Sequence, residues 1–220
     1  MSTIDWPLLT LLPPHRRDEL LSRARRRRFS KGHPVFHEGD DGNALFLLER
    51  GHVAVHLVTV DGHEITVQVL GPASSFGELA LLDDRGARNA SVIALDAVEV
   101  LRIERRDFVE LCSTDMAVIA HLLGQLVATV QRSTTLYAEA LHLSADRRVK
   151  RRLVELAELY GAESMPPIVR LTHDDLASVA GTSRQTVTET IGELAALGVL
   201  TQGRAVLRID DIDALREQAR

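Results

Sequence analysis

The spacing of apolar residues changes near residue 110, and this change limits what the chain can fold into. Before that point, apolar residues form short runs separated by glycine, which is typical of β-strands. After it, an apolar seam recurs at alternating intervals of three and four residues, through Met116, Ile119, Leu123, Leu126, Val130, Ser133 and Tyr137. A block of strands followed by a block of helices predicts an α+β protein.

The first block predicts an antiparallel β-roll. Its expected strands cover 34–36, 44–48, 53–58, 65–70, 91–94 and 98–101. Asp61-Gly62 lies between two of these runs and predicts a tight hairpin, since glycine adopts the positive φ that such a turn requires. A helix is expected before the roll, from about Pro14 to Arg27, with the run Arg25-Arg26-Arg27-Arg28 at its solvated C-terminal end.

The heptad seam predicts a long helix over about 109–141 that pairs with a second copy of itself. A long helix packed on the core of one chain is the alternative, although it would need a broader apolar stripe. Ser133, Thr134 and Thr135 interrupt the seam with hydroxyl groups. Polar residues in such a seam fix its register or contact something polar.

Composition narrows the class of protein. A chain of 220 residues with 45% hydrophobic and 26% charged residues can bury one or two globular cores. Its single cysteine, Cys112, excludes an internal disulfide and a four-thiolate cluster, and it lacks the partners of a catalytic nucleophile. The single cysteine favours a reducing, cytoplasmic setting, and we expect a protein that is not an enzyme and has no catalytic residue or metal. No stretch approaches 18 apolar residues, so no membrane partner is expected. The net charge of -5 gives no general attraction to nucleic acid.

The segment 76–91 has residue types that suit a phosphorylated ligand. Gly77 would let a ligand approach the backbone, and 78–82 could form a helical turn with free N–H groups. Arg88 could pair with phosphate oxygens, and Glu78 could accept from a sugar hydroxyl. Arg85 is a competing phosphate partner. On these residues alone, a polar loop between two strands explains the segment equally well.

Residues 171–200 have the spacing of a helix-turn-helix. Thr172 and Asp175 predict a capping box, Gly181 the turn, and Ser183 the cap of a second helix. Val187, Ile191 and Leu194 form its inner face. A wing is expected from 199–201 and 205–209, joined by a turn at Gln202-Gly203-Arg204. A structural helical hairpin is the alternative.

The outer face of the second helix carries side chains that suit base edges. Arg184 fits guanine, Gln185 adenine and Glu189 cytosine. Phosphate contacts are expected from Thr182, Ser183 and Thr186. Basic residues of the wing and of the preceding helix extend this surface, namely Arg204, Arg208, Arg147, Arg148, Lys150, Arg151 and Arg152. The distribution of charge, more than its sum, decides binding to DNA.

Two sets of motifs resemble the Crp/Fnr family of bacterial transcription regulators. The run Lys31 to Asp40, then Gly51-His52-Val53, Asp61-Gly62, and Phe76-Gly77-Glu78-Leu79 through Arg88-Asn89-Ala90-Ser91 resemble its cyclic-nucleotide-binding domain over about 80 residues. Leu176-Ala177, Gly181, Ser183-Arg184, Thr186-Val187 and Leu194 are similar to its C-terminal winged helix-turn-helix.

The resemblance implies a homodimeric, sequence-specific regulator whose effector, cyclic AMP, binds between the roll and the dimer helix. It implies a sensor domain over 1–141, with the dimer helix at about 109–141, and a DNA-binding domain over 142–220. The implied nucleotide site is Gly77, Glu78, Leu79, Arg88, Asn89, Ser133 and Thr134. The implied DNA site is Thr182, Ser183, Arg184, Gln185, Thr186, Thr188, Glu189 and Arg204. The implied partners are a near-palindromic double-stranded operator, a second copy of the chain and RNA polymerase, with no cofactor beyond the effector.

Asn89 departs from the family pattern, which has serine, threonine or alanine after the arginine. Cyclic GMP, cyclic di-GMP, a gas bound through haem, or no effector at all are therefore alternatives. Same-face histidine pairs, His33 with His37 and His52 with His56, are the residues that a haem or metal sensor would use.

Overall fold

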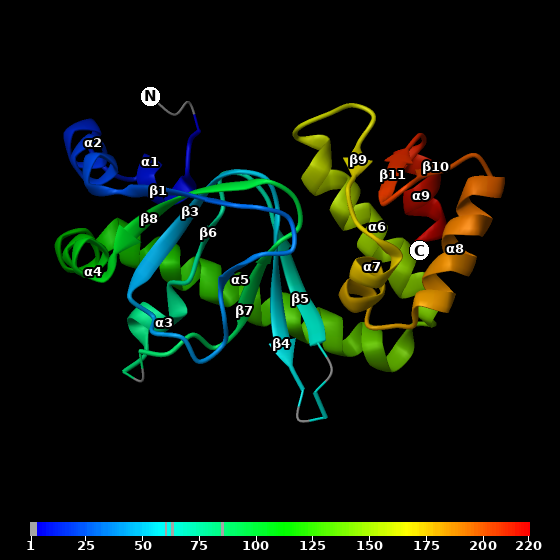
Figure 1. Ribbon diagram of the computed structural model, residues 1–220, viewed down its shortest axis with the longest axis horizontal. Helices are drawn as coiled ribbons and strands as arrows, with labels where there is room; N and C mark the ends of the chain where they lie inside the picture. The colour runs from blue at the N-terminus through cyan, green and yellow to red at the C-terminus, as the bar shows by residue number, and fades with distance from the viewer. Residues whose placement is uncertain (1–3, 60, 63, 85) are drawn as a thin grey trace. The chain divides into compact units, whose positions relative to one another are not determined.

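The computed structural model describes residues 4–59, 61–62, 64–84 and 86–220 (Figure 1). The contacts within the chain divide it into two compact units. The first unit consists of residues up to 57 together with 70–132, and the second of 58–69 together with 133–220. Arg85, the competing phosphate partner, lies outside the described residues.

Two antiparallel sheets form the predicted roll. One sheet has the order β1 (Arg25–Phe29), β8 (Val98–Glu104), β3 (Ala44–Arg50) and β6 (Ser75–Phe76). The other has the order β2 (Pro34–Phe36), β7 (Ser91–Ala94), β4 (Val53–Val58) and β5 (Glu64–Leu70). All six expected strands are present, and Gly62 has the positive φ, 81°, that the hairpin prediction required. The two-residue strand β6 was not predicted.

The central strand β3 organises two apolar cores because both of its faces are buried. Leu45 and Leu47 point to one side, where they pack with apolar residues of the helices. Phe46 and Leu48 point to the other side, into the space between the two sheets. A strand buried on both faces carries no alternation of polar and apolar residues, which is how this run reads in the sequence.

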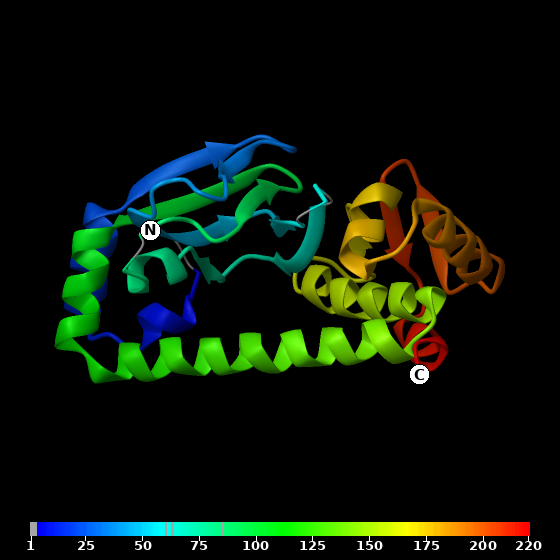
Figure 2. The ribbon, with the colours of Figure 1, turned by 90° about the horizontal axis from the view of Figure 1, so that it is seen from below.

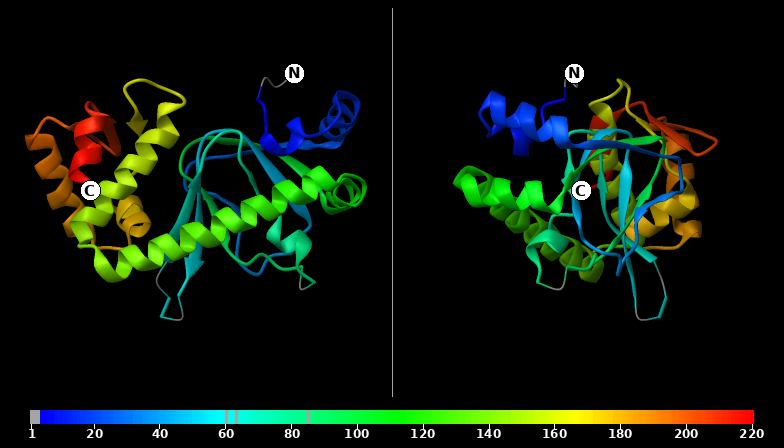
Figure 3. Two further views of the ribbon diagram at one scale, coloured as in Figure 1. Left: turned by 180° about the vertical axis from the view of Figure 1, so that it is seen from behind. Right: turned by 60° about the vertical axis from the view of Figure 1, so that its left-hand side comes forward.

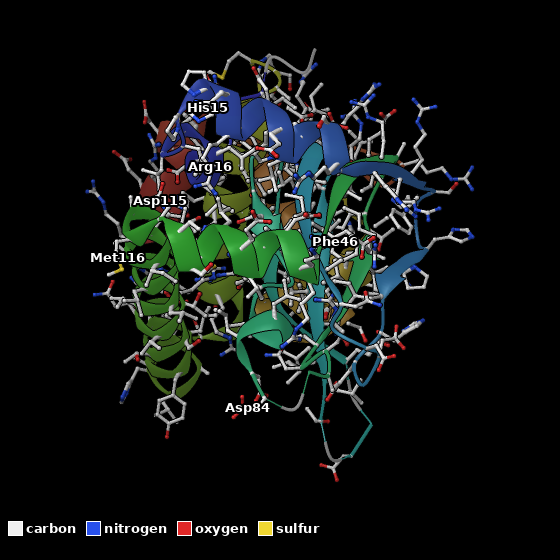
Figure 4. All side chains as sticks on the ribbon, turned by 90° about the vertical axis from the view of Figure 1, so that its left-hand side faces the viewer. His15, Arg16, Phe46, Asp84, Asp115 and Met116 are labelled. Atoms are coloured by element: carbon white, nitrogen blue, oxygen red, sulfur yellow. The ribbon has the colours of Figure 1, made fainter. Side chains whose placement is uncertain are left out.

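Helices close the first core. α1 (Pro7–Thr10), α2 (Pro14–Arg23) and α4 (Arg105–Thr114) contribute to it, and Trp6 next to α1 donates its indole N–H to the carbonyl of Leu48 (3.2 Å). Arg16 of α2 donates to Thr114 Oγ1 at the end of α4 (2.8 Å), near Asp115 (Figure 4). The N-terminal segment is therefore part of the folded unit.

The prediction that Arg25-Arg26-Arg27-Arg28 ends a helix was wrong. α2 ends at Arg23, and the four arginines lie in β1, an edge strand paired along its whole length with β8. Arg26 makes two bonds to Glu49 of β3 (2.6 and 2.7 Å), and Arg28 pairs with Glu99 of β8 (3.1 Å). These carboxylates are distant in the sequence, and they supply charge partners that a helix end could not have reached.

The long helix begins later than predicted. α5 (Met116–His142) follows α4 across a bend of 108°, which Figure 3 shows in its left view. Asp115 separates the two helices in an extended conformation, and its carboxylate accepts from the amide of Ala117 (3.0 Å). Among the described residues no single helix has the length and hydropathy of a membrane span, and α4 and α5 reach them only jointly, across this bend.

The second unit contains the predicted DNA-binding region, made of the helix-turn-helix and the wing and called the reader below. Its elements are α6 (Ala145–Gly161), β9 (Ile168–Val169), α7 (His173–Ala180), α8 (Arg184–Ala196), β10 (Leu200–Gly203), β11 (Val206–Ile209) and α9 (Ile212–Gln218), with the sheet order β10-β11-β9. The wing turn differs from the prediction. Gly203 pairs with Val206 within the strands, and the left-handed residue is Ala205 (φ 54°).

Two ion pairs, one of them buried, join the end of α5 to α6. Glu139 binds Arg152 (2.5 Å) and Arg151 (3.1 Å), and the side chains of Glu139 and Arg152 are 7% and 3% exposed. Arg152 also pairs with Glu155 (2.9 Å). The last turns of α5 are thereby fixed to α6 by charges that the protein has removed from water.

Candidate nucleotide pocket and DNA interface

The segment between β6 and β7 has the local structure that its glycine predicted. Gly77 adopts φ 89°, and α3 (Leu79–Leu82) follows directly after Glu78. A Cβ atom on Gly77 would lie 2.6 Å from Nη1 of Arg88. The positive φ therefore favours glycine at this position, and a Cβ would in addition displace the guanidinium of Arg88.

Arg88 points into the roll. Its side chain donates to the carbonyls of Gly77 and Ala44, both at 2.7 Å, and lies 4.2 Å from the ring centre of Phe36. The residue is 4% exposed. Burial, with the charge of Arg102 as a second cause, lowers the pKa of Arg88. A buried guanidinium in this state gains from any anion that approaches it.

Glu78 is held with one oxygen unsatisfied. Its Oε2 is shielded from solvent and has no hydrogen-bond partner among the described residues. Burial raises the pKa of Glu78, while a backbone hydrogen bond and the charge of Arg88 act in the opposite direction. An orphaned buried acceptor is costly, and a ligand hydroxyl would satisfy it.

A cavity of about 320 Å³ opens beside this segment, on the side of α5. Its lining consists of Leu79, Ala80, Leu82, Asp83, Ala87, Asn89 and Leu126. In Figure 2, α3 lies between the strands of the roll and the first half of α5. Of the predicted nucleotide residues, Leu79 and Asn89 therefore reach a cavity that borders α5. Gly77, Glu78 and Arg88 are not part of its lining, and the exposed Ser133 and Thr134 lie on α5 in the second unit.

α5 has two different faces. Val118 and Leu122 are buried toward the first core. An exposed apolar set runs along the helix, comprising Met116, Leu123, Val127, Val130, Tyr137 and Leu141, and Figure 4 shows Met116 at its start. Met116 is 79% exposed and Val130 is 64% exposed. Contiguous apolar surface of this kind indicates an interaction face.

The helix-turn-helix forms as its capping residues predicted. Thr172 and Asp175 make a reciprocal capping box, Gly181 ends α7 at φ 59°, and Ser183 Oγ accepts from the amide of Thr186 (3.2 Å). The inner face of α8 is buried through Val187, Thr190, Ile191 and Leu194. Its outer face is exposed through Arg184, Gln185, Thr188 and Glu189. Gln185 donates to Glu189 (3.0 Å), and Arg184 pairs with Asp174 (3.4 Å).

The basic helix before the reader contributes less free charge than its sequence suggests. Arg148 donates to the carbonyls of Leu143 (3.0 Å), Ala180 (3.1 Å) and Gly181 (2.8 Å). Lys150 and Arg152 are buried. Only Arg147 and Arg151 of this set are exposed, and Arg151 pairs with Glu139. Arg204 on the wing is exposed, and Arg208 bonds Asp210 (2.6 Å).

Both halves of the chain match known protein families. Residues 26–115 match the cyclic nucleotide-binding domain, and residues 147–218 match the Crp-like helix-turn-helix domain. A cyclic AMP receptor protein from Thermus thermophilus is 35% identical over 214 residues, covering 97% of this chain and 96% of that protein. The chain belongs to the Crp/Fnr family.

Further relatives of this Crp/Fnr protein carry related names. A CRP-like cAMP-activated global transcriptional regulator from Mycobacterium tuberculosis is 29% identical over 197 residues, which is 87% of each chain. The solved catabolite activator protein of Thermus thermophilus is 34% identical and has a TM-score of 0.51, with 97% and 98% of the two chains covered. The c-di-GMP responsive regulator CLP of Xanthomonas campestris shares the fold at 22% identity, with a TM-score of 0.74 over 90% and 99% of the chains.

Family membership confirms the predicted class of function. The Crp/Fnr protein is a cyclic-nucleotide-binding, DNA-binding regulator of transcription, and its relatives are regulators and not enzymes. Within the residues that the structure describes, no three His, Cys, Asp or Glu side chains gather in a group that could hold a metal ion.

One residue of the reader was missed from the sequence. His173, the first residue of α7, contacts Thr188 of α8 (2.9 Å) and Gln202 of β10 (3.1 Å). The sequence signal that could have found His173 is its position directly after the Thr172 cap, because the start of α7 faces α8.

Proposed function

We propose that the chain is a homodimeric regulator switched by cyclic AMP, which binds beside α3 against α5. The observation that carries this proposal is the shielded, unpartnered Oε2 of Glu78 next to the buried cation Arg88. A hydroxyl satisfies the first group and a phosphate the second, and a cyclic nucleotide carries both on one rigid ring system.

The cavity beside α3 has room for a mononucleotide. Small-molecule sites usually measure about 300 to 1,000 Å³, and a cavity of about 320 Å³ lies at the lower end of this range. Cyclic di-GMP, to which CLP is described as responsive, is about twice as large. Cyclic GMP remains the close competitor, because Asn89 adds an amide to the cavity wall that could bind a different base or phosphate edge.

In this proposal Arg88 binds the phosphate through N–H groups that its two backbone carbonyl bonds do not use. Its Nε has no partner among the described residues, so at least one N–H is available before any bond breaks. Ser133 and Thr134, on the exposed apolar side of α5, supply base contacts from this chain and from the second copy. A ligand that contacts α5 has different affinities for its different placements, which is the requirement for allosteric control.

A binding titration tests the effector. Cyclic AMP, cyclic GMP and cyclic di-GMP are each titrated by calorimetry into the full chain, and then into the full chain with double-stranded DNA selected from a random pool. Glu78→Gln should weaken cyclic AMP binding at least tenfold, whereas the control Asp84→Asn, an exposed carboxylate of the same loop, should not. Absence of binding by all three nucleotides, with intact DNA binding, would refute the proposal.

The second copy is tested by light scattering after size exclusion. Leu123→Asp places a charge on the exposed apolar face of α5 and should shift the dimer toward monomer. Val109→Asp is the matched control, because Val109 is an exposed apolar residue of α4 (47%) outside that face. An unchanged dimer in Leu123→Asp would exclude α5 as the interface.

A further inference from the structure

The imidazole of His173 connects three elements of the DNA-reading surface. Its Nδ1 lies 2.9 Å from Oγ1 of Thr188 on α8, and its Nε2 lies 3.1 Å from Nε2 of Gln202 on β10. His173 itself begins α7. His173 and Gln202 also line a cavity of about 370 Å³ between α7, the start of α8 and the wing.

The hydrogen bonds determine which nitrogen carries the proton. The single hydroxyl proton of Thr188 is donated to the carbonyl of Arg184 (2.9 Å). The contact between Thr188 and His173 therefore needs the imidazole as donor, so Nδ1 carries hydrogen. A neutral imidazole then has a lone pair on Nε2, and this lone pair accepts from the amide nitrogen of Gln202.

With the nitrogen of the Gln202 amide facing the imidazole, every group in this chain of bonds is satisfied in that protonation state. A proton added to Nε2 would oppose the amide N–H of Gln202, and the contact would break or require the amide to turn over. The charged groups around the imidazole act in both directions. Asp174 and Asp175 on α7 favour the added charge, and Arg184 on α8 and Arg204 on the wing oppose it.

We propose that His173 is a positioning residue that holds the wing to the recognition helix in its neutral, Nδ1-protonated form, and that protonation releases the wing. The inference rests on the DNA-binding role of α8 and the wing. Thr188 lies on the exposed face of α8, and Gln202 precedes Arg204 on the wing, so the bridge sets the spacing between the two surfaces that meet DNA.

The test measures affinity for one double-stranded DNA, selected by the full chain from a random pool, between pH 8 and pH 5.5. At pH 8, His173→Ala and Gln202→Ala should each weaken binding by about 3- to 10-fold, the range of one or two net hydrogen bonds. The double variant should bind no more weakly than His173→Ala, because both changes remove the same bridge. His142→Asn, an exposed histidine at the end of α5, is the control and should bind like the wild type.

The dependence on pH separates positioning from simple charge. The ratio of dissociation constants between Gln202→Ala and wild type should fall toward one as the pH falls, because acid has already opened the bridge. The salt dependence at pH 8 should be equal in wild type and His173→Ala, since a neutral imidazole releases no counterion. A ratio that is constant with pH, or a salt slope reduced by about one in His173→Ala, would overturn the proposal.

Two further measurements keep the outcome clear. His173→Asn retains a donor for Thr188 but does not reach Gln202, so it should behave like His173→Ala if the wing contact is what counts. Thermal unfolding of each variant identifies one that fails to fold. The wild-type affinity at pH 8 tests DNA binding independently of His173.

Discussion

Removing Arg152 should destabilise the second unit more than any exposed ion pair can. In Arg152→Met, the carboxylate of Glu139, 7% exposed, loses a partner at 2.5 Å and keeps only Arg151 at 3.1 Å. Breaking a buried pair on one side costs about 3 to 5 kcal/mol. Because Arg151 still neutralises part of the charge, we expect a loss of about 3 kcal/mol, at the lower end of this range.

The matched control is the exposed pair between Arg216 and Glu158. Its side chains are 47% and 55% exposed and meet at 2.9 Å, a distance similar to that of the buried pair. Glu158→Gln should cost less than about 1 kcal/mol, because exposed pairs are solvated and screened. Arg152 also pairs with Glu155, and Arg216 also pairs with Asp213, so the two variants compare a buried cluster of charges with an exposed one.

The assay is native-state hydrogen exchange of the α6 amides, at a fixed protein concentration because assembly contributes to stability. The double variant with methionine at positions 139 and 152 should recover most of the loss, since replacing a whole buried pair by apolar groups is often neutral. A cost of less than about 1 kcal/mol for Arg152→Met would refute the role of burial. The same holds if the losses from Glu139→Met and Arg152→Met simply add in the double variant.

Three further predictions concern other parts of the chain. Gly77→Ala should lose about 1 to 3 kcal/mol of unfolding free energy together with nucleotide binding, because of its φ of 89° and the crowding of Arg88; calorimetry measures both, and unchanged values would contradict the role of this backbone. Glu78→Gln should remove a pH dependence of the free energy of unfolding. Burial raises the pKa of Glu78, so stability without ligand falls as pH rises from the ordinary glutamate range through the raised pKa, and the variant should lack this fall in unfolding experiments at several pH values. Thr172→Ala removes one half of the capping box and should cost about 1 kcal/mol by thermal unfolding, and an unchanged unfolding free energy would contradict the role of this cap.

Local signals predicted the elements whose causes are local. The period change near residue 110, the hairpin at Gly62 and the caps at Thr172 and Ser183 each depend on residues within a few positions of one another, and the structure confirms them. The strand β1 could not be predicted in this way. Its arginines favour a strand because Glu49 and Glu99 lie across the sheet, more than 20 residues away in the chain.

The nucleotide site shows the same limit at the level of side chains. The sequence indicates that Gly77, Glu78 and Arg88 belong together, and Gly77 and Arg88 are in contact. It does not indicate that Arg88 turns inward onto Phe36, because that direction depends on an aromatic cluster formed by three separate strands. Likewise the basic run at 147–152 suggests free positive charge, and only the tertiary structure assigns Arg148, Lys150 and Arg152 to internal contacts.

The buried contacts of Glu139 also decide where the protein can be divided. A fragment that begins at residue 142, where the helical pattern ends, would leave the buried Arg152 without Glu139 and with only the partly exposed Glu155 among the two carboxylates described above. A fragment that begins at 133 keeps the pair intact and contains the C-terminal segment of the second compact unit, although it lacks that unit's segment 58–69. In a truncation experiment, the last three turns of α5 therefore belong with the reader.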